Sequence, residues 1–182
     1  MATVPAPVLA PYWPIVYVRG YAMTPAEIAD AVSSPYMGFN VGATKLRQAW
    51  DGQVRRHVFE SPLVRLMKDC GYRDIYTDGT EIIGPVPARS VVIYRYYDNA
   101  DPDLGAGKVP SIVAAAEGLR DLVHRLRVQV CGDDAEALAQ FKVHLVAHSM
   151  GGLVCRCFLQ NDSVSTPADR ALVDKVFTYA TP

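Results

Sequence analysis

The chain has 182 residues, of which 50% are hydrophobic and 20% charged, and its formal net charge is -1. This length suffices for one domain with a sizeable core, and the composition excludes a disordered chain. Without a basic excess, nothing indicates a nucleic-acid partner or a uniform field that would attract anionic membranes.

The first segment, Met1–Trp13, is punctuated by three prolines and contains no lysine or arginine. It therefore lacks the charged start and apolar core of a signal peptide and is expected to be extended. No apolar run in the chain reaches membrane-spanning length, so no transmembrane segment is expected.

Short apolar runs and helix-start signals then alternate along the chain. Strands are predicted at Ile15–Val18, Val91–Tyr97, Val143–Ala147 and Val176–Ala180. Thr24-Pro25-Ala26-Glu27, Ser61-Pro62, Ser111 and Thr166-Pro167 each combine a capping side chain with the start of a helical pattern. Those helices should include one ending near Ser33, one over Leu63–Cys70 and a long one after Ser111. Between the first two, Tyr36–Ala43 is predicted to be a loop, Thr44–Trp50 a helical turn and Val54–Phe59 a strand or an extended link.

This alternation predicts an α/β fold, a parallel sheet with helices on both faces, in a single domain over residues 1–182. The connection over residues 22–90 is much longer than a crossover needs. It forms either a cap over the strand ends or additional helices at the periphery.

Four cysteines, Cys70, Cys131, Cys155 and Cys157, match no zinc-binding spacing. We expect buried free thiols in a reducing compartment, a cytoplasmic location, and neither a metal nor a cofactor.

The segment Val143–Val154 combines an apolar strand, a tight turn that carries Ser149, and a helix. Small residues, Ala147 and Gly151, lie two positions either side of the serine, as a sharp turn requires. A serine presented in this way at the end of a parallel strand is a candidate nucleophile, with Met150 opening the helix behind it. The alternative is an ordinary strand-to-helix connection with an incidental serine.

The segment Ala147-His148-Ser149-Met150-Gly151-Gly152 resembles the nucleophile turn of the α/β-hydrolase superfamily, the serine lipases and esterases, in the form with alanine at the first position. Pro14–Tyr21 is similar to the first long strand of that superfamily with its oxyanion loop, and Asp174–Pro182 to the strand after the nucleophile helix. The resemblance implies Ser149 as the catalytic nucleophile and the backbone N–H groups of Tyr21 and Met150 as the oxyanion hole.

The resemblance also leaves gaps. Arg19 stands where relatives have histidine; it could pair with Asp98, contact an anionic substrate group or form an ordinary salt bridge. The acid and the histidine of a triad should follow Ser149, yet the four histidines, His57, His124, His144 and His148, all precede it. Asp98 is the nearest candidate for the acid, and His57 is the one histidine that could reach the site. We therefore expect the chain to be the N-terminal part of a longer enzyme, incomplete at its C-terminus.

The function predicted is a serine hydrolase that cleaves carboxylic esters, including lipid esters, through an acyl-enzyme on Ser149. Its partner is then a small-molecule or lipid ester. An acyltransferase would use the same residues, and a non-catalytic α/β-hydrolase-like binding protein would need no base.

Overall fold

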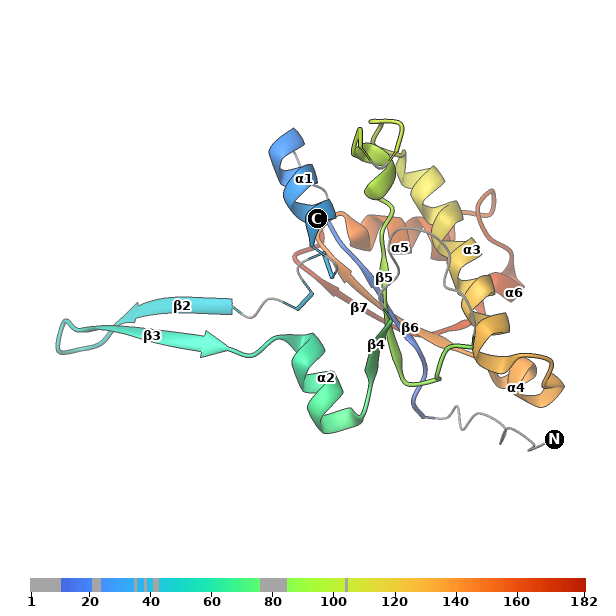
Figure 1. Cartoon of the computed structure of the whole chain (residues 1–182), viewed down its shortest axis with the longest axis horizontal. Coiled ribbons are helices and arrows are strands. Elements are labelled where there is room, and N and C mark those ends of the chain that lie inside the picture. The colour runs from blue at the N-terminus through green and yellow to red at the C-terminus, as the bar shows by residue number, and fades with distance from the viewer. Residues whose placement is uncertain are drawn as a thin grey trace.

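Five parallel strands form the centre of the protein in a computed structural model, which describes residues 11–20, 24–34, 36–37, 39–40, 43–75, 85–103 and 105–182. Their order across the sheet is β4-β5-β1-β6-β7 (Figure 1). The strands span β4 (Arg73–Ile75), β5 (Ser90–Tyr94), β1 (Ile15–Val18), β6 (Val143–His148) and β7 (Val173–Tyr179). The α/β class, the parallel sheet and the order of the four predicted strands are therefore confirmed.

The extents of several strands differ from the prediction: β7 begins at Val173 rather than Val176 and ends at Tyr179, and β6 runs one residue further, to His148. The strand β5 ends at Tyr94, because Tyr96 and Tyr97 lie in a turn before a short 3-10 helix, Asp98–Ala100. The edge strand β4 was not predicted, since three residues with two charged side chains carry no apolar pattern.

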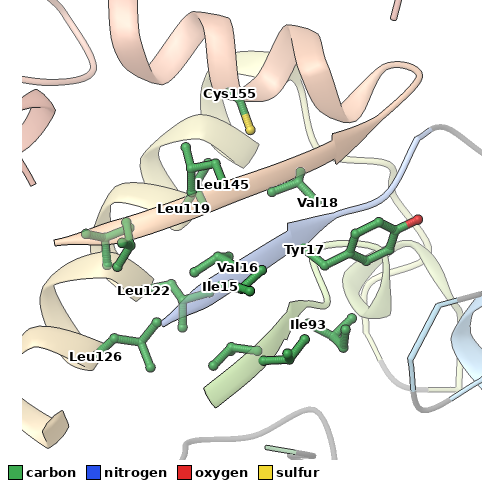
Figure 2. Packing of buried hydrophobic residues seen from close by; sticks show 14 of the residues in the cluster. Ile15, Val16, Tyr17, Val18, Ile93, Leu119, Leu122, Leu126, Leu145 and Cys155 are labelled. Carbon is green, nitrogen blue, oxygen red and sulfur yellow. The ribbon is translucent and has the colours of Figure 1, made fainter. Parts of the chain in front are cut away.

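One face of the sheet is covered by α3 (Ile112–Cys131) and α5 (Gly151–Gln160), which pack side by side. Figure 2 shows Leu119, Leu122 and Leu126 of α3 against β1 and β6. Alternate residues of β6 are buried under these helices, beginning with Val143. Val143 and Leu145 each contribute roughly 1.5–3 kcal/mol when they are removed from water.

The opposite face is covered less completely. Phe39 stacks on Tyr17 with 4.3 Å between ring centroids, but His144, Val146 and His148 of β6 are only half-buried. Nearly all of β7 is exposed, and Phe177 is 61% exposed. The prediction of helices on both faces is thus confirmed for the α3–α5 face, while the other face of β6 and β7 is open in the described residues.

The helix starts follow the capping signals. Helices α1 (Pro25–Ser33), α2 (Pro62–Cys70) and α6 (Pro167–Arg170) each begin with a proline behind a capping threonine or serine. In α1 and α6 the side chain of the capping threonine accepts a hydrogen bond from the backbone N–H of an acidic residue three positions further on. The side chain of that acidic residue accepts one from the backbone N–H of the threonine. A fourth, α4 (Ala135–Gln140), begins behind the carboxylate of Asp134. These signals are local, so they predict the start of a helix well.

The connection over residues 22–90 contains α1, an antiparallel hairpin of β2 (Ala43–Gln48) and β3 (Val54–Phe59), α2 and β4. The helical turn predicted at Thr44–Trp50 is wrong, because this segment pairs with β3 across a tight turn. Figure 1 shows the hairpin extending away from the sheet, with α1 nearer to the strand ends. None of the helices in these described ranges is both long and apolar enough to cross a membrane.

Candidate functional site

Ser149 lies between the last residue of β6 and the first turn of α5. Its φ is +51°, in the left-handed region that a residue with a side chain rarely adopts, which costs roughly 1–3 kcal/mol. The backbone N–H of Ser149 donates to the Tyr179 carbonyl of β7 at 2.9 Å, and its own carbonyl accepts from Gly152 N–H at 3.0 Å. The neighbouring strand and the helix together hold the strained turn, and the serine side chain sits at the carboxyl edge of the sheet.

Two glycines allow this turn to approach β1 closely. An ideal Cβ on Gly20 would lie 2.5 Å from the Ser149 Cβ and 3.1 Å from its Oγ, so the chain after β1 runs directly against the serine. An ideal Cβ on Gly151 would lie 2.2 Å from the Val18 carbonyl oxygen. Both contacts require glycine, and they bring the end of β1, the serine and the start of α5 to one place.

The residues after β7 pack against the start of α5, next to the serine turn. After Tyr179 the chain turns at Ala180, whose φ is +52°, and Thr181 packs against Gly152. An ideal Cβ on Gly152 would lie 2.2 Å from Thr181 Oγ1, a buried oxygen with no hydrogen-bond partner in the described residues. The contacts of Tyr179 and Thr181 with this turn were not predicted from the sequence, because a contact between distant segments leaves no periodic signal.

Of the two predicted oxyanion donors, the structure describes Met150 only. Met150 is the N-cap of α5, immediately after Ser149, where backbone N–H groups at a helix start are not all used inside the helix. Tyr21 lies outside the described residues. Its neighbour Gly20 is the residue that abuts Ser149, so the chain enters this loop beside the serine.

Arg19 does not pair with Asp98. It donates from Nη1 to the Met37 carbonyl at 2.9 Å, which ties the loop after β1 to the segment that follows α1. Asp98 instead forms a two-point ion pair with Arg95, at 2.8 and 2.9 Å, with both side chains largely buried. Asp98 is thus engaged in holding the end of β5, and no contact links it to Ser149.

His148 is the described histidine adjacent to Ser149 in the chain, and its ring packs on Tyr179 with 4.9 Å between centroids. Burial lowers the pKa of His148 below its ordinary value, and the positive charge of Arg19 lowers that pKa further. On the same face of the sheet, the Tyr179 hydroxyl donates to the Tyr17 hydroxyl at 3.1 Å. The ring of His148 is therefore part of an aromatic group beside the turn.

The other histidines lie elsewhere. His124 of α3 is 2.7 Å from Asp169, and His144 opens β6 at the end remote from Ser149, 3.5 Å from Asp174. His57 belongs to β3, in the hairpin that extends away from the sheet (Figure 1). Across the described ranges, no side chain hydrogen bonds to the Ser149 hydroxyl, so the base that a serine nucleophile needs is not assembled among them.

The remaining candidates for chemistry are few. All four cysteines are free thiols; Cys131 and Cys155 are buried, while Cys70 and Cys157 are only half-buried. Burial raises the pKa of the Cys155 thiol to about 12, which makes it a poor nucleophile at neutral pH. Within the part of the chain that the structure describes, no three His, Cys, Asp or Glu side chains group closely enough to hold a metal ion.

The geometry thus defines an α/β protein in which a strained turn presents one serine at the carboxyl edge of a parallel sheet. Comparison of the chain with models of protein families, with curated proteins and with solved structures gives no match.

Proposed function

We propose that the protein is a serine hydrolase of the α/β-hydrolase type that cleaves carboxylic esters, lipid esters included, through an acyl-enzyme on Ser149. The observation that carries the proposal is the conformation of Ser149. A serine held at φ +51° between a parallel strand and the helix that follows it is the strained turn on which this class of enzyme presents its nucleophile. Residues held in such conformations cluster at active sites.

In the proposed reaction, Ser149 Oγ attacks the carbonyl carbon of the ester and its proton passes to a base. The resulting oxyanion is stabilised by the backbone N–H groups of Met150 and Tyr21, each worth about 3 kcal/mol in the transition state. Collapse of the tetrahedral intermediate breaks the bond to the alcohol oxygen, which takes the proton from the base. Water then releases the acid and restores the serine; attack by an alcohol instead would give acyl transfer.

The proposal requires a base that reaches Ser149. No histidine of the described residues contacts its hydroxyl, and this observation favours a second candidate, a non-catalytic binding protein with the same fold. Without a base, turnover falls by up to roughly a millionfold.

A fluorophosphonate probe distinguishes the two functions, because it forms a covalent bond only with an activated serine. We expect incorporation at Ser149, located by mass spectrometry of the digested protein, and none in Ser149→Ala. Ser163, an exposed serine outside the site, provides the matched control: Ser163→Ala should be labelled like the wild-type protein. Labelling that survives in Ser149→Ala would overturn the assignment of Ser149 as the nucleophile. Absence of labelling in the wild-type protein would show that these 182 residues supply no base to Ser149 and would favour the binding protein. If labelling occurs, replacement of His57 by alanine tests whether that histidine is the base.

A further inference from the structure

The β2–β3 hairpin is exposed at each residue from Trp50 to Arg56. It extends away from the sheet in Figure 1, and its turn is closed by a hydrogen bond from the Ala49 N–H to the Gln53 carbonyl at 2.8 Å. Trp50 occupies this turn and is 97% exposed. A tryptophan side chain left wholly in water at the tip of a projecting element gains nothing from the fold of its own chain.

Two further large apolar side chains are exposed on the same hairpin. Leu46 of β2 is 69% exposed and Val54 of β3 is 66% exposed. A tryptophan, a leucine and a valine therefore lie in water on one short hairpin. Exposed apolar groups that gather in this way indicate a binding surface, whereas scattered single residues do not.

The hairpin is also strongly basic. Lys45, Arg47, Arg55 and Arg56 against Asp51 give residues 43–59 a formal charge of +3, so the rest of the chain, with -1 overall, carries -4. The strand register places Leu46 opposite Arg56 and Gln48 opposite Val54, so Leu46, Val54 and Arg56 share one face of the hairpin and Arg55 lies on the other.

We propose that the β2–β3 hairpin binds the surface of an anionic lipid bilayer. With the hairpin lying flat on the face that carries Leu46, Val54 and Arg56, the leucine and the valine would enter the apolar boundary. Trp50 and Arg56 would lie at the level of the headgroups, where tryptophan is enriched in membrane proteins. The basic residues on the other face are attracted through the field of the anionic surface, which extends over about 10 Å at 0.1 M salt. A nucleic acid would use the arginines and the tryptophan but leave Leu46 and Val54 in water, so a lipid surface fits the whole set better. This inference does not depend on the chemistry of Ser149.

Vesicle cosedimentation tests the proposal on the whole chain. At about 0.1 M salt the protein should sediment with vesicles of phosphatidylcholine and phosphatidylserine, bind phosphatidylcholine alone far more weakly, and dissociate as salt rises toward about 1 M. The variant Arg55→Gln/Arg56→Gln should partition about 25-fold more weakly, since each basic residue near such a surface contributes about fivefold. The matched control Arg73→Gln/Arg156→Gln removes two exposed arginines outside the hairpin and should bind the vesicles as strongly as the wild-type protein does.

Tryptophan fluorescence locates the contact. The chain has two tryptophans, Trp13 and Trp50, so Trp13→Phe leaves Trp50 as the sole reporter. Its emission should shift to shorter wavelength when the anionic vesicles are added and should become protected from acrylamide. Trp50→Ser should weaken binding, whereas Phe177→Ser, which removes an exposed aromatic group from β7, should not.

Three results would overturn the proposal: no sedimentation with the anionic vesicles at low salt, an unchanged Trp50 emission on binding, or equal losses in the variants and their controls. Binding to a single-stranded oligonucleotide without binding to vesicles would assign the hairpin to nucleic acid instead.

Discussion

Replacement of Gly151 by alanine should destabilise the protein and displace its serine turn. The added Cβ would lie 2.2 Å from the Val18 carbonyl oxygen and 2.7 Å from that of Arg19. Ordinary contact begins at 3.4 Å, so the start of α5 must retreat from β1 by about 1.2 Å. Both obstacles are backbone atoms at the end of β1, which cannot rotate out of the way as a side chain can.

The cost follows from the gap that this retreat opens. A gap of about 1 Å forfeits a quarter to a half of the dispersion energy between the surfaces it separates. The helix α5 buries Val154, Cys155 and Phe158 against the sheet, and overpacking of such a core costs roughly 1–3 kcal/mol. We expect about 3 kcal/mol for Gly151→Ala, which corresponds to a decrease in Tm of roughly 6–12 °C for a domain of this size.

The matched control is Gly118→Ala in α3. Its Cβ would meet the Tyr94 hydroxyl at 2.3 Å, the far end of a side chain rather than backbone. Displacement of that hydroxyl breaks its hydrogen bond to the Ala115 carbonyl, which contributes about 1 kcal/mol to stability. The higher helix propensity of alanine offsets this loss by about 1 kcal/mol. Urea unfolding should therefore show little change for Gly118→Ala. A free energy of unfolding for Gly151→Ala within about 1 kcal/mol of the wild-type value would refute the close packing of the serine turn on β1.

Three other changes test the surroundings of the site. Asp98→Ala leaves the buried guanidinium of Arg95 without its carboxylate and should lower the free energy of unfolding by roughly 3–5 kcal/mol in urea; a loss below about 1 kcal/mol would show the pair to be solvated. Arg19→Met removes a nearby positive charge and should raise the pKa of His148 toward its ordinary value in an NMR titration, while an unchanged pKa would mean that the two groups do not interact. Although burial opposes it, hydrogen bonds from the capping threonine of α6 and a contact with the α3 histidine lower the pKa of Asp169, so its ionised form stabilises the fold. That stability is present above the unfolded pKa of about 3.9 and is lost as the pH falls through the folded pKa. In Asp169→Asn, the free energy of unfolding should therefore fall less steeply as the pH is lowered through this range.

Several features could be predicted from the sequence because their causes are local. Thr24 and Thr166 cap helices with acidic residues three positions on, and those helices begin where the signals place them. The apolar run over Val143–Ala147 predicted a buried parallel strand, and β6 lies at that position between β1 and β7. The placement of Ser149 between strand and helix follows from the same short range of residues.

Only half of the hairpin could be predicted in this way. Val54–Phe59 was expected to be a strand or an extended link, and β3 spans those residues. Thr44–Trp50 was expected to be helical, because Leu46 faces water and β2 lacks the alternation with a buried side that identifies a strand. The basic character of the hairpin was hidden too, since the rest of the chain offsets it and the net charge is close to zero.

The sequence by itself therefore determined the elements whose signals are local: capped helices, buried parallel strands and the sharp turn at Ser149. Only the tertiary structure decided which distant residues meet there, such as Gly20 against the serine, the Tyr179 carbonyl on its N–H and Thr181 on the first turn of α5. The physical reason is that capping and periodicity act within a few residues, whereas close approach depends on how strands separated by more than a hundred residues pair in one sheet.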